Sequence, residues 1–140
     1  MPYSNVIEPR RLTDMQDMEV CVNGPDGANR LFIYSGMAEV ELCGGMPHPR
    51  WSLEVICFDI GRTYDIADES IVKITATAAL AGNRTDGVAS FAGWQIFGAA
   101  AELDDETNRV RMNIAAGARD TQAFLEQISF QVHVLARIKE

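Results

Sequence analysis

The side chains that could perform acid–base or nucleophilic chemistry are few and scattered along the chain. Only two histidines are present, His48 and His133. His48 lies between two prolines in a turn-like segment, and His133 occupies a polar position in a run of alternating residues. A nucleophile needs a base and an orienting group within hydrogen-bonding reach, and no serine lies in a Gly-x-Ser-x-Gly segment. We interpret both histidines as surface residues and favour a non-catalytic protein over an enzyme.

The cysteines do not have the spacing of a metal site. Structural zinc sites usually contain close ligand pairs of the form Cys-x₂₋₄-Cys. Cys21, Cys43 and Cys57 are instead far apart, and each lies in a predicted strand. Cys43 and His48 are separated by a turn and form an isolated pair of ligands. We therefore predict unreactive thiols, no metal site and no cofactor.

Carboxylates gather in two loops. The first contains Asp65, Asp68 and Glu69, and the second contains Asp104, Asp105 and Glu106. Neither loop has the alternating ligands, central glycine and distal glutamate of a calcium-binding loop, so we interpret both as solvated turns and leave weak binding of a hard cation open. Glu39 and Glu54 face each other in the strand pairing predicted below, as a glycosidase pair would. Like charges also meet at the edges of sheets, so this signal is weak.

Length, composition and charge predict one globular domain with an acidic surface. The chain has 140 residues, of which 47% are apolar and 23% charged. Those fractions are ordinary for a folded protein, and this length supports a hydrophobic core without disulfides. The formal net charge is -8 at pH 7. Nucleic-acid affinity comes largely from Lys and Arg at phosphates, so we expect no nucleic acid and no membrane as partner.

The sequence also favours a cytoplasmic protein. The first residues contain no apolar stretch of the kind that a secretory signal requires. No run of about 18 apolar residues is available to span a membrane. The three cysteines are odd in number and too few for a secreted disulfide framework. We therefore expect a reducing compartment.

Alternation of apolar and polar residues predicts strands, because successive side chains of a strand point to opposite faces. Residues 1–16 lack this alternation and are interrupted by Pro2 and Pro9. We predict an irregular N-terminal arm over residues 1–16 and a β domain over residues 17–140.

A first hairpin is predicted around the turn-rich segment that precedes Arg50. If residues 38–43 pair with residues 50–55, Val40 lies beside Leu53 on one apolar face. The same register places Trp51 among apolar neighbours. We therefore predict that Trp51 belongs to the core.

Two further hairpins are predicted to form a meander. Residues 72–81 would pair with residues 88–97, and the next turn would then pair Leu103 with Asn108. Both pairings turn the side chain of Phe97 inward. A shift of one residue in either hairpin would break this agreement.

The last predicted strand, residues 127–138, has the clearest alternation in the chain. Helix has little room, and the best candidates are short turns near residues 64–70 and 119–126. About seven strands with Gly- and Pro-bearing turns predict an all-β, single-domain antiparallel β-sandwich or flattened barrel.

The predicted register leaves one unusual surface on the meander. Its residues are Trp94, Ile96, Gly98 and Ala100 on one strand and Arg109, Arg111, Asn113 and Ala115 on the next. The outward face of a solvated sheet is normally polar. An aromatic ring beside small residues instead lets another backbone or a flat ligand approach closely.

Three interpretations of this surface remain open. The first is an assembly module that forms a homo-oligomer or binds a protein partner, with Trp94 and Ile96 as anchors. The second is a small-molecule or carbohydrate binder that uses this face or an internal cavity. The small residues that would leave such a cavity are Ala76, Ala78, Ala89, Gly93, Ala99 and Ala101. The third is that another part of the same chain covers the surface.

Overall fold

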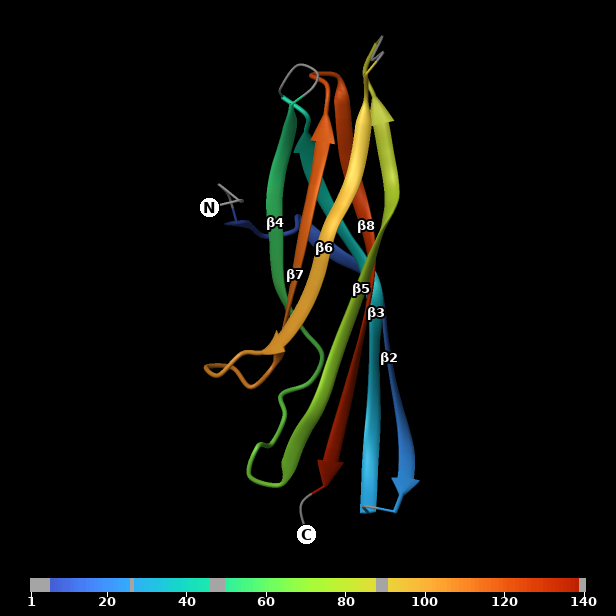
Figure 1. Ribbon diagram of the computed structural model, residues 1–140, viewed down its shortest axis with the longest axis vertical. Coiled ribbons are helices and arrows are strands. Elements are labelled where there is room, and N and C mark those ends of the chain that lie inside the picture. Colours follow the sequence, from blue (N-terminus) through green and yellow to red (C-terminus); the bar gives the residue numbers. More distant parts are fainter. Residues whose placement is uncertain (1–5, 26, 46–49, 88–90, 139–140) are drawn as a thin grey trace.

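The computed structural model of the chain describes residues 6–25, 27–45, 50–87 and 91–138. These residues form eight strands and no helix (Figure 1). The strands are β1 (Val6–Ile7), β2 (Arg11–Gly24), β3 (Gly27–Cys43), β4 (Trp51–Ile60), β5 (Glu69–Thr85), β6 (Gly93–Leu103), β7 (Val110–Arg119) and β8 (Ala123–Ile138). Among the described residues, therefore, no helix is long and apolar enough to cross a membrane.

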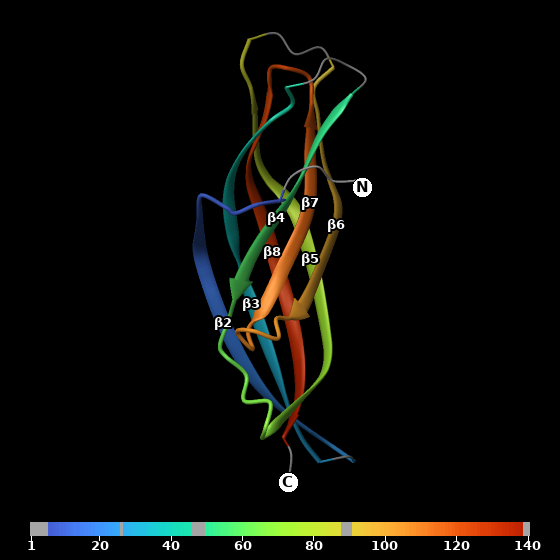
Figure 2. The ribbon, with the colours of Figure 1, turned by 90° about the vertical axis from the view of Figure 1, so that its left-hand side faces the viewer.

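The strands form two four-stranded sheets that pack face to face. Sheet A has the order β1-β4-β7-β6, and sheet B has the order β2-β3-β8-β5. Every neighbouring pair is antiparallel except the short parallel contact between β1 and β4. The strands of sheet B run well beyond the end of sheet A toward the C-terminus (Figures 1 and 2). The predicted all-β sandwich is confirmed, with eight strands instead of about seven.

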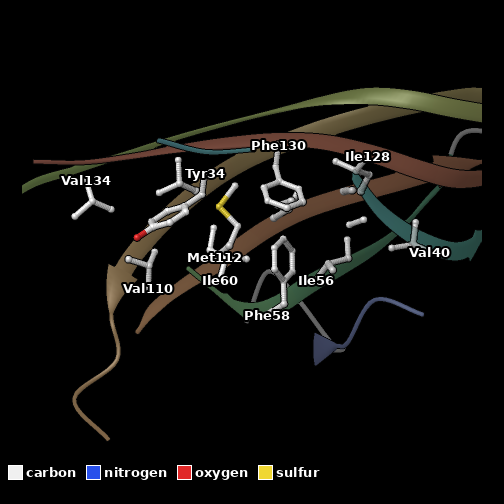
Figure 3. Packing of buried hydrophobic residues seen from close by; sticks show 14 of the residues in the cluster. Tyr34, Val40, Ile56, Phe58, Ile60, Val110, Met112, Ile128, Phe130 and Val134 are labelled. Carbon is white, nitrogen blue, oxygen red and sulfur yellow. The ribbon is translucent and has the colours of Figure 1, made fainter. Parts of the chain in front are cut away.

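The core lies between the sheets and follows from the alternation in each strand. Alternate residues of β4, β7, β3 and β8 are fully or almost fully buried. Phe58 of sheet A and Phe130 of sheet B meet edge to face, with ring centroids 4.9 Å apart (Figure 3). Full burial of one such side chain stabilises the fold by roughly 1.5–3 kcal/mol.

The first two predicted hairpins are wrong. β3 pairs with β2 and β8 in sheet B, while β4 pairs with β1 and β7 in sheet A. In the same way, β5 belongs to sheet B and β6 to sheet A. Each of these connections crosses from one layer to the other. Alternation specifies which face of a strand is buried, and both layers bury their inner faces in the same core, so the pattern did not identify the neighbouring strand.

The third predicted hairpin, between β6 and β7, is confirmed with a shift of two residues. Leu103 pairs with Val110, not with Asn108. The connecting loop is longer than predicted, and within it Asn108 adopts a left-handed conformation, with φ of 54°, and donates its N–H to the Asp104 carbonyl at 2.7 Å. A shift of two residues keeps the side chains of β7 and of residues 98–103 of β6 on their predicted faces.

The N-terminal arm is shorter than predicted, because β2 begins at Arg11. The pairing of β2 with β3 is irregular between Thr13 and Gln16, where Asp14 has a φ of 53°. This bulge interrupts the alternation and hides the first part of the strand in the sequence pattern. No helix forms at either predicted turn, but residues 66–68 do form a turn, in which the Asp65 carbonyl accepts the N–H groups of Asp68 and Glu69 at 3.1 and 2.8 Å. Near the second predicted turn, β8 already begins at Ala123.

Candidate functional site

A β-bulge at Phe97 divides the surface that the sequence predicted. Ile96 pairs with Ala116 and Gly98 pairs with Ala115, so Phe97 is the extra residue. Beyond a bulge the inward and outward positions exchange relative to simple alternation. Trp94 and Ile96 therefore pack against the core, whereas Phe97 is 39% exposed. The predictions that Trp94 is outward and Phe97 inward are both wrong.

Trp94 has a structural role. Its indole Nε1 donates a hydrogen bond to the Phe124 carbonyl at 2.9 Å, which ties β6 to β8 across the sandwich. Arg109 is also removed from the predicted surface, because its Nε donates to the Gly61 carbonyl at 3.0 Å in the loop region. Neither residue is placed to bind a partner on the outer face of sheet A.

The remaining predicted residues do share that outer face. Gly98 and Ala100 of β6 are exposed, and Arg111, Asn113 and Ala115 lie on β7 at neighbouring positions. The aromatic residues of this face are Phe97 and Trp51, not Trp94. We call this surface the Trp51 face and define it as Trp51, Leu53, Val55, Phe97, Gly98, Ala100, Ala115 and Gly117.

Glycine positions shape the Trp51 face. Trp51 and Phe97 meet edge to face with ring centroids 5.6 Å apart and an interplanar angle of 88°. A Cβ added at Gly117 would lie 3.1 Å from the Phe97 ring and 2.6 Å from the Ser52 carbonyl oxygen. One added at Gly93 would lie 2.9 Å from the Trp51 ring. The two aromatic rings therefore lie directly on the backbone of β6 and β7. Trp51, predicted as core, is half-buried on this outer surface.

One end of the Trp51 face is basic. Arg119 pairs with Trp51 across β4 and β7, and its guanidinium carbon lies 5.0 Å from the indole centroid. The same guanidinium donates from Nε to the Phe91 carbonyl at 2.9 Å. These contacts fix the cation beside the aromatic pair, where it can contribute to recognition of a partner.

The opposite end carries more carboxylates than cations. Arg111 forms ion pairs with Asp59 at 3.2 Å and with Asp104 at 2.9 Å, and Glu102 is its cross-strand neighbour. The pKa of the Arg111 guanidinium is raised by its hydrogen bond to Asp59 and by the nearby carboxylates. Because Arg111 is already engaged, this end presents a mainly acidic surface.

Cys57 lies between the apolar and acidic parts of this face. Its thiol donates to the Asn113 side-chain oxygen. Burial raises the pKa of the Cys57 thiol, and the lowering effect of Arg111 is weaker. Asp59 and Glu102 raise the pKa further. The thiol is therefore protonated at neutral pH and is a poor nucleophile.

The other candidate chemistry from the sequence is not brought together. No group of three or more His, Cys, Asp or Glu side chains suited to a metal ion occurs among the described residues. Glu39 lies in sheet B and is paired with Arg11, while Glu54 lies in sheet A, so the predicted facing pair does not form. His48 falls outside the described residues, and His133 is half-buried between Ile33 and Thr75.

The two acidic loops use their carboxylates to form turns. The carboxylate of Asp65 accepts the Ala67 N–H at 3.1 Å, and that of Asp104 accepts the Glu106 N–H at 3.0 Å. Such side-chain-to-backbone bonds stabilise turns locally. Glu69 instead accepts two hydrogen bonds from Arg62, each 2.8 Å long.

Four of the small residues that were predicted to point inward contact the core, and one of them, Ala78, also borders a groove on the surface. Ala76, Ala78, Ala99 and Ala101 pack against the core cluster. The space beside Gly93 is taken by the Trp51 ring and by Arg119. Ala89 lies outside the described residues.

A phase change in the sequence marks the bulge, which a simple two-residue periodicity does not predict. Apolar residues that face inward occupy positions 94 and 96 and then 99, 101 and 103. The step from an even to an odd series needs one extra residue, and Phe97-Gly98 is the only place in that stretch where it fits. Reading this step as a bulge would have turned Phe97 outward.

Comparison of the chain with models of protein families, with curated proteins and with solved structures finds no match.

Proposed function

We propose that this protein is a non-catalytic assembly module that self-associates through the Trp51 face. The proposed partner is a second copy of the chain, and the proposed setting is the cytoplasm. The proposal concerns the same sheet face that the sequence singled out, with Trp51 and Phe97 in place of Trp94 and Ile96 as its anchors.

The observation that carries this proposal is an aromatic pair, the half-buried Trp51 and the exposed Phe97, on a floor of small residues. Phe97 is 39% exposed, and Gly98 and Ala100 beside it are exposed as well. Large aromatic anchors surrounded by close-packed neighbours are typical of the centres of protein interfaces. Small floor residues allow a second sheet to approach to the usual spacing of about 10 Å between packed sheets.

The charges at the two ends of the face favour a second copy as the partner. Arg119 lies at the Trp51 end, whereas Asp59 and Glu102 lie at the other. When two copies pack about a two-fold axis with their strands antiparallel, Arg119 of each copy approaches the acidic end of the other. Such an isologous contact buries the same patch on both subunits.

Gly98 provides the sharpest test of this interface. A Cβ at Gly98 meets no atom within 4 Å, and the residue is exposed, so Gly98→Glu is compatible with the folded subunit. In the proposed interface the same side chain would project into the second copy. We expect native protein to be oligomeric by light scattering on a sizing column, and Gly98→Glu to shift to a smaller species with unchanged far-UV circular dichroism.

Thr77→Glu is the matched control, because Thr77 is exposed on the outer face of sheet B. It adds the same charge away from the Trp51 face and should leave the mass unchanged. A native monomer, or an oligomer that Gly98→Glu leaves intact, contradicts the proposal. A native monomer whose tryptophan fluorescence responds to sugars or planar compounds would instead support the ligand-binding alternative.

A further inference from the structure

The second surface of interest is the free edge of sheet B. Among the described residues, β2 pairs only with β3, and from Gln16 to Gly24 this pairing is regular. Figure 2 shows β2 at the margin of the sheet with no described strand on its other side. An edge strand presents unpaired backbone N–H and C=O groups that can pair with another chain. This part of β2 is therefore suited to strand addition.

The side chains of this edge divide into an apolar and a polar row. Met18, Val20 and Val22 lie on the outer face of sheet B and are 59%, 39% and 42% exposed. On the inner face the row is Asp17, Glu19, Cys21 and Asn23. The apolar row extends from the edge strand onto β3, because Met18 pairs with Ile33 and Val20 pairs with Leu31. Ile33 and Leu31 are both half-buried.

We propose that β2 pairs antiparallel with β2 of a second copy, about a two-fold axis through Val20, so that sheet B continues across both copies. This inference rests on the β2 edge alone and adds a second contact to the proposed assembly. In this register Val20 faces Val20 of the other copy, and Met18 faces Val22. The apolar rows of the two copies then form one uninterrupted surface.

The acidic residues select this register. With Val20 at the centre, Glu19 faces Cys21 and Asp17 faces Asn23, so each carboxylate meets a neutral side chain. A centre at Glu19 would place two glutamates directly opposite each other, and a centre at Met18 would oppose Asp17 and Glu19. Like charges at directly opposite positions destabilise a strand pair. Glu19 is in addition ion-paired with Arg30 of its own chain at 3.1 Å.

A centre at Cys21 also avoids facing carboxylates, but it matches the apolar row less well. There Met18 would face Gly24, and the most exposed side chain of the row would lose its apolar partner. Cross-strand apolar pairs are the main source of side-chain stabilisation in a sheet. Of these registers, the one centred at Val20 pairs the apolar side chains with one another and also keeps the carboxylates from facing each other.

Val20→Lys tests the contact. The side chain is exposed, so the subunit should still fold, whereas the register brings two ammonium groups directly opposite each other. We expect the dissociation constant of this contact to rise about tenfold or more, measured by sedimentation velocity. Thr77→Lys, on the exposed outer side of β5, is the control and should leave the constant unchanged. A Val20→Lys protein that associates like the control overturns the proposal.

Disulfide trapping tests the register. In a protein with Cys21 and Cys43 replaced by serine, Val20→Cys places two thiols at directly opposite positions, within the usual Cα separation of about 4.4–6.8 Å for a disulfide. Met18→Cys in the same background places them about 13 Å apart along the strands. Under mild oxidation we expect a covalent dimer from Val20→Cys and not from Met18→Cys. Equal trapping of both, or trapping of Met18→Cys alone, overturns the register.

The two proposed contacts fail separately. If both exist, Gly98→Glu should retain the β2 dimer, Val20→Lys should retain the dimer through the Trp51 face, and the double variant should be a monomer. If the single variant Gly98→Glu is a monomer, the β2 contact is contradicted and the Trp51 face is not. If the single variant Val20→Lys is a monomer, the contact through the Trp51 face is contradicted and the β2 contact is not.

Discussion

The hydroxyl groups of Tyr34 and Tyr64 form a buried hydrogen bond of 2.6 Å near the end of sheet A. Tyr34 belongs to β3, and Tyr64 to the loop of residues 61–68, which lies beside the part of sheet B that extends past sheet A (Figure 1). Burial raises the pKa of the Tyr64 phenol, and the hydrogen bond to Tyr34 raises it further. The Tyr64 phenol therefore remains neutral, and its hydrogen bond to Tyr34 fastens the loop to the sheet.

Removing one of these hydroxyls should destabilise the protein more than removing both. Tyr34→Phe leaves the Tyr64 oxygen buried without this partner, and an unsatisfied buried group costs about 1–3 kcal/mol. In Tyr34→Phe/Tyr64→Phe neither oxygen remains, so we expect recovery of part of the lost free energy of unfolding. Urea denaturation of the native protein, both single variants and the double variant measures this. Additive losses would show that the two hydroxyls do not interact.

The ion pair beside these phenols should make stability depend on pH. The hydrogen bonds from Arg62 lower the pKa of the Glu69 carboxyl below its ordinary value of 4.5. The unfolded chain then binds a proton at a higher pH than the folded chain, so the contribution of Glu69 is complete above about pH 4.5 and is lost as the pH falls through the lowered pKa. Glu69→Gln should be less stable at pH 7 and show a smaller loss of unfolding free energy from pH 6 to pH 3. An unchanged pH profile would exclude this role.

At the scale of single strands, the bulge at Phe97 determines which residues of β6 reach the surface. Without Phe97, Ile96 and Gly98 would meet Ala116 and Ala115 in a continuous ladder, with each on its present face. Deletion of Phe97 should therefore preserve β6, at a cost of no more than about 2 kcal/mol for the lost contact with Trp51. Thermal unfolding followed by circular dichroism tests this.

Deletion of Asn113 is the contrasting change. β7 pairs with β4 from Trp51 to Ile60 without a bulge, so one missing residue moves half of β7 onto the wrong face. We expect that variant to lose cooperative unfolding. If the two deletions were equally harmful, the bulge would not be the extra residue of the ladder.

The sequence predicted which face of a strand is buried better than it predicted which strands are neighbours in a sheet. Alternation correctly predicted a strand over residues 127–138 and the adjacency of β6 and β7, because burial and short loops are local properties. It paired β3 with β4 and β5 with β6 wrongly, because strands from opposite layers of a sandwich share one core and have the same pattern. Gly98, Ala100, Arg111, Asn113 and Ala115 share one outer face, as predicted, but the two-residue periodicity was carried through Phe97, so Trp94 and Ile96 were wrongly assigned to that face.

At the scale of the whole molecule, the proposed assembly has to overcome charge repulsion. Each copy carries a formal charge of -8 at pH 7. The two proposed contacts depend mainly on apolar groups, namely the Trp51 face and the row Met18, Val20 and Val22. Raising the ionic strength from 0.01 M to 0.1 M shortens the screening length from about 30 Å to about 10 Å. Salt should therefore weaken the repulsion more than it weakens the contacts.

We accordingly expect added salt to strengthen association. The dissociation constant should fall on the order of threefold or more between 0.01 M and 0.1 M sodium chloride, measured by sedimentation velocity at pH 7. Val20→Lys and Gly98→Glu, measured alongside, indicate which contact responds. An interface held mainly by ion pairs would show the opposite slope, because screening weakens attraction between opposite charges. That outcome would move the decisive contact from the aromatic pair to the charged ends of the Trp51 face, Arg119 and the carboxylates around Arg111.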